Sequence, residues 1–318
     1  MAKDDSSINR RQAMTLAGLS LAIPAWSSAA PAAPRLREAA PELAVPQPLP
    51  PPIEMREGLV DVPGARLFHR DSGGKGPAIL LAHPGTGSAL IWAYQEAALV
   101  AAGYRVVAWS RRGHYGTVVE QAGPNSGASD DIDRLADTLK IDRFHALGSA
   151  AGGGVMLDYA VARPHRVRTL AIACSIGNIA DPAYSARSVA LRPAPFDKLP
   201  AELRELGPCY RAANPEGVAQ WLALEHKARA APMGPPPAAG QRNGPRTQWS
   251  DVAALPMPIL WMTGDADLFT PPPLLAEFHA RTRGSEMAII HGAGHSAYWE
   301  QPRAFNATLI DFLKRRGG

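Results

Sequence analysis

Four short segments of the chain carry residue types that could perform chemistry, and each of them follows a predicted strand. They are His83–Ser88, Gly148–Gly153, Gly264–Pro271 and Gly292–Ser296. Ligands of open α/β sheets bind outside the carboxyl ends of the strands, so we expect these segments to meet at one edge of a sheet. An aspartate in the third segment and a histidine in the fourth would then form a hydrogen-bonded pair. In such a pair the carboxylate orients the imidazole, and the imidazole accepts a proton.

Predicted strands and helices, which must position these segments, alternate along the chain from Gly58 onward. Short apolar runs, typical of strands buried on both faces, are separated by segments with helical spacing. Such βαβ units form a mostly parallel sheet flanked by helices, which is an α/β fold. The predicted strands are 58–62 and 66–70, paired through a turn at Pro63-Gly64, then 78–82, 105–109, 144–147, 169–173, 258–262 and 287–290. One predicted helix follows the strand 78–82 and ends at about residue 102. The other predicted helices cover 129–139, 153–162, 271–280 and 296–314.

The alternation is interrupted between residues 176 and 255, where prolines are frequent. We expect short helices at 200–206 and 215–230, and no strand. A segment this long is more than a connection between two elements. We therefore predict a helical cap insertion at 176–255, with the core formed by 57–175 and 256–318.

Several motifs occur in the order and spacing of a known family. They are the His-x-Gly loop at His83, Arg-Arg-Gly-His at 111–114, Gly-x-x-Asp-x-x-x-Pro at 264–271, and Gly-x-Gly-His at 292–295 with Glu-Gln-Pro at 300–302. With these motifs the sequence resembles the α/β-hydrolase fold family, of the serine hydrolase or esterase type. The resemblance covers Gly58 to Phe312 except the insertion.

The chain departs from this family at the residue that should attack the substrate. The family's nucleophile elbow reads Gly-x-Ser-x-Gly-Gly. Here the framing glycines Gly148 and Gly152 place Ala150 at the serine position. An alanine methyl cannot attack a carbonyl carbon. Ser149 competes for the role of nucleophile, but at so tight a turn a slip of one residue points the side chain elsewhere.

Two interpretations of Ala150 are open. The chain is either an engineered Ser→Ala variant of a working enzyme or a natural protein with alanine at this position. Alanine removes one oxygen and preserves the turn, as a deliberate knockout would, and the rest of the machinery is present. We therefore favour the engineered variant, which would bind its substrate without cleaving it.

The resemblance implies a role for each remaining site residue. With a serine restored, His295 would take the hydroxyl proton and later give it to the leaving group, while Asp267 fixes the imidazole tautomer. The N–H groups of Gly85 and Ala151 would form the oxyanion hole, where one donor typically lowers the barrier by ~3–4 kcal/mol. Without the hydroxyl only slow attack by water, assisted by His295, would remain.

The acid and the base each have a competitor. Asp265 competes with Asp267, but the spacing to Pro271 favours Asp267 and leaves Asp265 as a turn former. His291 competes with His295, but His291 ends a predicted strand, whereas His295 lies in the glycine turn.

Other polar and aromatic residues have less specific expected roles. His83 and His114 are expected to make structural hydrogen bonds. The candidates for the substrate pocket are Thr86, Trp221, Phe269 and Tyr298, although aromatic residues at such places are equally often plain core.

The two cysteines, Cys174 and Cys209, could be bridged in an oxidising compartment, which would tie the insertion to the core. The histidines and acids show no ligand spacing such as His-Glu-x-x-His, so neither a metal nor a cofactor is expected.

Composition excludes several classes of protein. The 318 residues are 46% hydrophobic with a net charge of +4, which is too apolar and too weakly charged for a disordered chain. Lys and Arg are scattered, with no basic run interleaved with aromatics, so nucleic acid is not an expected partner. We expect a small-molecule ester as the partner and no stable membrane span. The oligomeric state is left open.

The amino-terminal residues are expected to serve as an export signal and not as part of the fold. Arg10-Arg11 precede a mildly apolar run and then small residues at 27–30, which resembles a twin-arginine export signal over residues 1–32. An amphipathic helix is the alternative. Residues 33–56 are rich in proline and predict an extended tether. Export by this route implies a periplasmic or secreted protein in a bacterium.

The first hypothesis is therefore an exported serine hydrolase that cleaves a carboxylic ester, disarmed at Ala150. Lactonases and carbon–carbon bond hydrolases share the triad and remain alternatives, whereas hydrolases with an aspartate nucleophile fit poorly. The second hypothesis is a natural, non-catalytic binding protein that uses the same pocket. The insertion has no motif that identifies the substrate.

Overall fold

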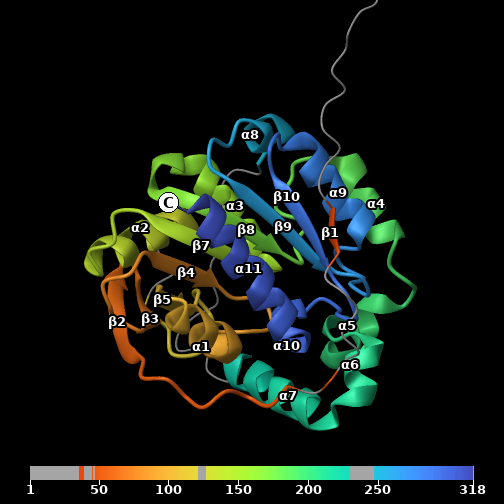
Figure 1. Cartoon of the computed structure of the whole chain (residues 1–318), viewed down its shortest axis with the longest axis horizontal. Helices are drawn as coiled ribbons and strands as arrows, with labels where there is room; N and C mark the ends of the chain where they lie inside the picture. Colours follow the sequence, from red (N-terminus) through yellow and green to blue (C-terminus); the bar gives the residue numbers. More distant parts are fainter. Residues whose placement is uncertain (1–35, 39–44, 46, 121–126, 230–246, 318) are drawn as a thin grey trace, which may run out of the picture. The chain divides into compact units, whose positions relative to one another are not determined.

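The computed structural model describes residues 36–38, 45, 47–120, 127–229 and 247–317 (Figure 1). The predicted export signal at 1–32 lies outside these residues. The strands are β1 (Leu36–Glu38), β2 (Arg56–Val62), β3 (Ala65–Asp71), β4 (Ala78–Ala82), β5 (Arg105–Trp109), β6 (Val118–Val119), β7 (Phe144–Ser149), β8 (Val167–Ala173), β9 (Ile259–Gly264) and β10 (Glu286–Ile290).

These strands form one ten-stranded sheet within the described part of the chain. Its order is β1-β10-β9-β8-β7-β4-β5-β3-β2, with β6 paired to β3. Every pairing from β1 to β5 is parallel, and β3 pairs antiparallel with β5, β2 and β6. All residues of β4 and β7 are buried, because helices cover both faces of a parallel sheet. The predicted, mostly parallel α/β sheet is confirmed.

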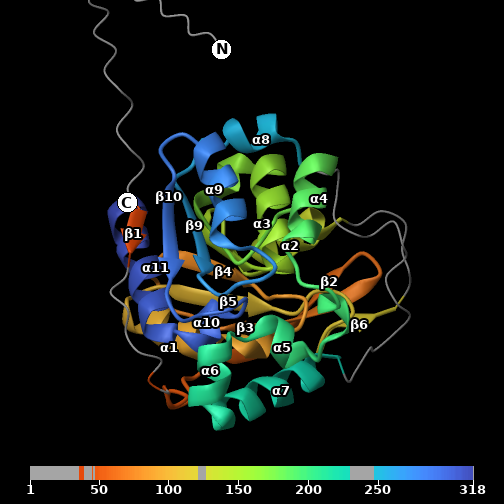
Figure 2. The same ribbon diagram turned by 90° about the vertical axis from the view of Figure 1, so that its right-hand side faces the viewer.

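Helices cover the two faces of the sheet (Figure 2). One apolar cluster contains side chains of α2, α3, α8 and α9, and the other contains side chains of α1 and α11. On α2, Ile132, Leu135 and Ala136 are the buried apolar residues, as their helical spacing predicts. The bounds are η1 (Ala89–Trp92), α1 (Ala93–Ala101), α2 (Ala128–Thr138), α3 (Ala151–Ala162), η2 (Pro164–Arg166), α8 (Trp249–Ala253), α9 (Pro272–Arg281), α10 (Ala297–Glu300) and α11 (Pro302–Arg316).

The segment between β8 and β9 is helical in its described part. It contains α4 (Pro182–Ala190), η3 (Phe196–Lys198), α5 (Ala201–Glu205), α6 (Pro208–Ala213) and α7 (Pro215–Arg229). Several of its prolines stand in the first turn of a helix, where a missing N–H costs nothing. Trp221 on α7 is fully buried, and the indole N–H of Trp299 donates to the carbonyl of Gly217 at 3.2 Å. We name the elements α4 to α7 the cap.

Two local predictions differ from the structure. The single helix predicted at 296–314 is two helices, because α11 begins at Pro302, and proline cannot donate the hydrogen bond that would continue α10. The short strand β6 has no counterpart among the predicted strands. In the described part of the proline-rich segment, β1 pairs with β10 at the edge of the sheet.

No helix in the described ranges is long and apolar enough to cross a membrane. The same ranges contain no group of three or more His, Cys, Asp or Glu side chains that could hold a metal ion.

Candidate active site

The turn between β7 and α3 has the geometry of a nucleophile elbow. Ala150 stands between the two elements with φ 51° and ψ −117°, a left-handed conformation that is costly for a residue with a Cβ. Neighbouring backbone requires the framing glycines: a Cβ on Gly148 would clash with the carbonyl of Gly152, and one on Gly152 would clash with the carbonyl of Ala82. The close packing of strand on helix therefore forces the sharp turn.

Hydrogen bonds hold Ala150 on both sides. Its N–H donates to the carbonyl of Ala173 on β8 at 2.9 Å, and its carbonyl accepts from Gly153 at 3.0 Å. Ser149 has a fully buried side chain that does not line the cavity described below. Ser149 thus belongs to the sheet, and half-buried Ala150 occupies the apex of the turn and lines the cavity.

His295 and Asp267 form the predicted pair. The Nδ1 of His295 lies 3.0 and 2.9 Å from the two carboxylate oxygens of Asp267. Because a carboxylate accepts, Nδ1 carries the proton and Nε2 is left as the base. Asp267 also accepts from the N–H groups of Phe269 at 2.8 Å and Thr270 at 2.9 Å, and from the hydroxyl of Thr263 at 3.2 Å.

The charges of this pair support each other. Burial alone would raise the pKa of Asp267, but the charge and hydrogen bond of His295 outweigh burial and keep that pKa below its usual value. Burial alone would lower the pKa of His295, but the charges of Asp267, Glu205 and Glu300 and the hydrogen bond to Asp267 together outweigh burial and raise that pKa. The pair is therefore suited to stabilise an imidazolium that forms during a reaction.

One cavity of about 330 Å³ brings the site residues together. It lies between the elbow and the cap, and Asp267 stands behind His295, away from its lining. The lining residues are Gly85, Ala150, Ala151, Gly154, Cys174, Ser175, Ile176, Gly177, Asn178, Arg192, Glu205, Phe269, Thr270 and His295.

The two predicted oxyanion donors lie next to each other. A Cβ built on Gly85 would be 3.8 Å from the Cβ of Ala151, and both residues line the cavity. Ala151 is the first residue of α3, so its N–H has no partner within the helix and lies at the positive end of the helix dipole. The arrangement can accept negative charge at the elbow.

Arg111 holds the loop that carries Gly85. Its guanidinium donates to the carbonyls of His83 at 3.2 Å and Pro84 at 3.1 Å. Its backbone N–H donates to Nε2 of His83 at 3.0 Å, which leaves the proton of His83 on Nδ1, 2.7 Å from the carbonyl of Pro84. Burial and the nearby Arg111 charge lower the pKa of His83 well below its usual value. His83 is thus a neutral structural residue. Arg111 is a positioning residue, and the only signal for it in the sequence is its place in the Arg-Arg-Gly-His motif.

Glu300 positions the loop that carries His295. Its carboxylate accepts from Gly294 at 3.0 Å and from Ser296 at 3.2 Å, the residues on either side of His295. It also accepts from Gly207 of the cap at 2.7 Å. Burial raises the pKa of Glu300 to about 8, and the three backbone N–H donors oppose this rise. Its place in the Glu-Gln-Pro motif was the only signal in the sequence for this role.

Two cap residues that the sequence did not single out reach the cavity. Glu205 is buried, and its Oε2 has no hydrogen-bond partner in the described residues. The guanidinium carbon of Arg192 lies 5.0 Å from the ring centre of Phe269, and that ring lies tilted against the His295 ring with centroids 4.3 Å apart. The pocket therefore has a carboxyl group and a cation opposite the elbow.

Other candidates lie elsewhere. Asp265 and His291 pair with each other, with His291 Nδ1 3.1 Å from Asp265 Oδ2, and neither lines the cavity. Thr86, Trp221 and Tyr298 are buried and are not part of its lining, whereas Phe269 is.

The Nδ1 of His114 lies 2.9 Å from the carbonyl of Gly87, a structural contact of the kind expected for this residue.

The cysteines form no disulfide. Cys174 is buried at the cavity and Cys209 is exposed, and both are free, so the bridge considered for an oxidising compartment is absent. Cys174 has φ 50°. Burial raises the pKa of its thiol well above the usual value, so the thiol stays protonated and is a poor nucleophile.

Comparison with known proteins agrees with this geometry. Residues 79–308 match the model of the "Alpha/beta hydrolase family". The chain is 26% identical to the "Putative carbamate hydrolase RutD" of Caulobacter sp. (strain K31), covering 81% of this chain and 98% of the relative. It is 25% identical to a 2-hydroxy-6-oxononadienedioate/2-hydroxy-6-oxononatrienedioate hydrolase of Paraburkholderia xenovorans (strain LB400), covering 82% and 94%.

Solved structures show the same fold. A thermophilic esterase from Thermogutta terrifontis has a TM-score of 0.67 at 20% identity, covering 83% of this chain and all of that one. The enol-lactonase of Burkholderia xenovorans LB400 has a TM-score of 0.65 at 23% identity, covering 81% and 100%. Together with the match over most of the chain and the elbow, these likenesses lead to one conclusion: the chain belongs to the α/β-hydrolase family.

Proposed function

We propose that the chain binds a small carboxylic ester in the cavity between elbow and cap, and that Ala150 replaces the serine of a Ser-His-Asp hydrolase. The observation that carries this proposal is the His295–Asp267 pair beside a strained elbow. A strained backbone persists only where its surroundings hold it. Here the strain, the base and the oxyanion donors are present without a nucleophile to use them.

The residues would act in the usual order once a hydroxyl stands at position 150. His295 Nε2 takes the hydroxyl proton as the oxygen bonds to the ester carbonyl carbon, and the N–H groups of Gly85 and Ala151 bind the oxygen that becomes negative. The protonated His295 then gives its proton to the leaving alkoxide, which departs as an alcohol. Water, activated by His295, releases the acid from the acyl-enzyme.

With alanine in place the chain keeps the binding pocket and loses the covalent route. His295 could still assist the attack of a water molecule on a bound ester, but this reaction is slower by several orders of magnitude, by about 10⁶-fold in an enzyme without its serine. The expected behaviour of the chain itself is therefore binding of the substrate with little turnover.

A carbamate is the second candidate substrate. The unpartnered Oε2 of Glu205 faces a cavity where a ligand N–H could bind it, and a buried acceptor without a partner is costly. A carbamate supplies such an N–H, whereas a simple ester does not. A relative of this chain carries the name carbamate hydrolase, which supports this candidate.

The test is the variant Ala150→Ser, assayed with p-nitrophenyl esters of short acids and with a p-nitrophenyl carbamate. We expect a gain of at least about 10³-fold over the parent chain, because the triad then acts as a unit. Ala150→Ser/His295→Ala is the matched control and should lose this gain. A folded but inactive Ala150→Ser protein would favour the natural, non-catalytic binding protein instead.

A further inference from the structure

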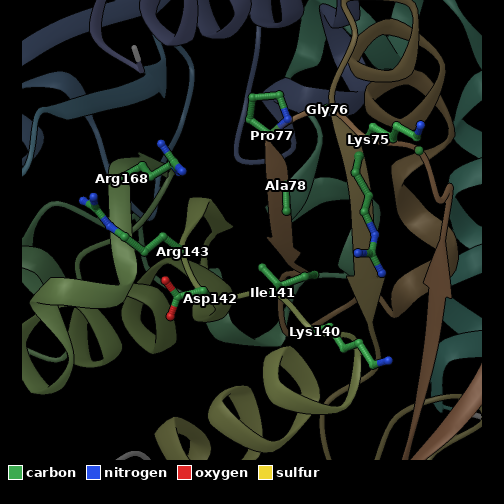
Figure 3. A pocket seen from close by; sticks show the side chains of 11 residues that line it. Lys75, Gly76, Pro77, Ala78, Lys140, Ile141, Asp142, Arg143 and Arg168 are labelled. Atoms are coloured by element: carbon green, nitrogen blue, oxygen red, sulfur yellow. The ribbon is translucent and has the colours of Figure 1, made fainter.

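A second cavity, of about 450 Å³, lies at the opposite edge of the sheet from the catalytic cavity. Figure 3 shows it from close by. It is formed around the amino ends of β4, β5, β7 and β8, whereas the elbow follows the carboxyl end of β7. It shares no lining residue with the catalytic cavity. Its lining residues are Gly74, Lys75, Gly76, Pro77, Ala78, Arg105, Lys140, Ile141, Asp142, Arg143 and Arg168.

Cations dominate this lining. Five of the residues are Lys or Arg, and Asp142 is the single carboxylate among them. Arg105 is neutralised by Asp71, with an N–O distance of 2.6 Å. The other four cations, Lys75, Lys140, Arg143 and Arg168, form no ion pair within the described ranges. Like charges gathered around one hollow repel each other, and a bound anion would remove this cost.

A local irregularity of the sheet places Arg168 in this cavity. In the pairing of β7 with β8, Phe144 lies opposite Val167 and His145 opposite Thr169, so Arg168 is the extra residue of a β-bulge. Bulges re-aim a side chain. The Nε of Arg168 is buried without a hydrogen-bond partner in the described residues. Figure 3 shows its guanidinium on the same side of the hollow as that of Arg143.

The loop before β4 leaves the hollow open. Gly74 has φ +96°, and no atom lies within 4 Å of a Cβ built there. Lys75 follows in this loop, and Lys140 and Arg143 belong to the connection between α2 and β7. The cations therefore come from three separate segments of the chain and surround the space from different directions.

We propose that this cavity binds a compact phosphorylated anion, independently of the catalytic cavity. Guanidinium groups bind phosphate oxygens through paired N–H donors, and lysine ammonium groups add point charges. A phosphate group carries about −1.5 to −2 charges at neutral pH, against −1 for a carboxylate, and this larger charge matches four unpaired cations around one small space. The volume lies in the range of small-ligand sites.

The test measures binding of inorganic tripolyphosphate to the full chain by isothermal titration calorimetry, with citrate as the carboxylate comparison. We expect saturable binding of one tripolyphosphate per chain. Raising the ionic strength about sixfold, from about 50 to about 300 mM salt, should weaken tripolyphosphate binding severalfold, because salt screens exposed charges. Citrate should bind at least about tenfold more weakly. Equal affinity for citrate, or no saturable binding, would overturn the proposal.

Matched variants separate this site from general positive charge. Arg143→Gln/Arg168→Gln should raise the dissociation constant for tripolyphosphate at least about tenfold, since hydrogen bonds to charged groups are the strong ones. Arg134→Gln/Arg303→Gln removes the same charge from exposed positions outside the lining and should leave binding unchanged. An equal loss in both double variants would contradict a specific site. Lys75→Gln/Lys140→Gln, at two exposed side chains, repeats the test if the arginine variant does not fold.

Discussion

The strained backbone conformation of Ala150 positions the residues around it. With φ 51° it pays a strain of about 1–3 kcal/mol for a non-glycine residue in this region. The turn places Ala151 beside Gly85 and the apex of the elbow on the cavity that His295 lines. At the scale of single residues, the proposed hydrolase differs from this chain by the one hydroxyl oxygen that a serine would carry at position 150.

The first prediction at this scale concerns Asp267. In the Ala150→Ser protein, Asp267→Asn should lower kcat by about 10⁴-fold, because an amide that donates to Nδ1 would stabilise the wrong imidazole tautomer. Ester turnover with saturating substrate measures the effect. Asp265→Asn is the matched control, since Asp265 pairs with His291 away from the cavity. Equal losses in the two variants would refute the assignment of Asp267.

A second prediction concerns the pH dependence of the same protein. His295 acts as a base only when neutral. Burial would lower its pKa, but the charges of Asp267, Glu205 and Glu300 and the hydrogen bond to Asp267 together raise it above 6.5. Activity should therefore fall as the pH drops, with the midpoint of kcat/KM above 6.5. A pH–rate profile with its acid limb centred at or below 6.5 would contradict this reasoning.

At the scale of elements, the loop after β10 and the cap are joined through one carboxylate. Glu300 stands at the end of α10 and accepts from N–H groups on both sides of His295 and from Gly207, which precedes α6. The carbonyl of Glu205 at the end of α5 accepts from Ser296 at 3.0 Å. The position of His295 therefore depends on the docking of the cap.

Glu300→Ala tests this dependence. The substitution leaves three buried N–H groups without their acceptor, at about 1–3 kcal/mol for each unpaired group. We expect a free energy of unfolding lower by at least about 2 kcal/mol, together with a lower kcat in the Ala150→Ser background. Urea unfolding and ester turnover are the measurements. A variant with lower stability but unchanged kcat would show that Glu300 supports the fold without positioning His295.

Strands and helices could be predicted where the pattern of apolar residues is contained within the element itself. The apolar runs of β4 and β5 are strands with the predicted bounds, 78–82 and 105–109, because a buried parallel strand has a continuous apolar sequence. β6, of two residues, is too short to show a period. The role of Arg192 and Glu205 could not be predicted, because the helices of the cap carry no motif and reach the cavity only by docking on the core.

At the scale of the whole molecule, the sheet separates two cavities of different chemistry. The carboxyl edge holds an acid–base pair under a cap, and the amino edge holds four cations without carboxylate partners in the described part. A parallel sheet has two such edges because all its strands point the same way. Ligands at the two edges are therefore expected to bind without displacing each other.

A global consequence of the buried carboxylate is a dependence of stability on pH. Burial raises the pKa of Glu300 to about 8 in the folded chain, from 4.5, so the folded state holds this proton where the unfolded state has lost it. Its contribution to stability is complete below the unfolded pKa and is lost as the pH rises toward the folded pKa. The denaturant concentration at the unfolding midpoint should therefore decrease as the pH is raised from 5 to 8. Glu300→Gln should remove part of this slope, and an unchanged slope would assign it to other groups.

The order of motifs along the chain determined the fold, the elbow and the pair Asp267–His295, because these depend on short-range patterns and on the rule that strand ends meet at one edge. Tertiary structure alone decided which side chains share a cavity. Trp221 and Tyr298 entered the core, Glu205 and Arg192 entered the pocket, and Arg168 joined Arg143 at the far edge. These outcomes depend on how distant segments pack, and packing brings together residues whose separation along the chain carries no local signal.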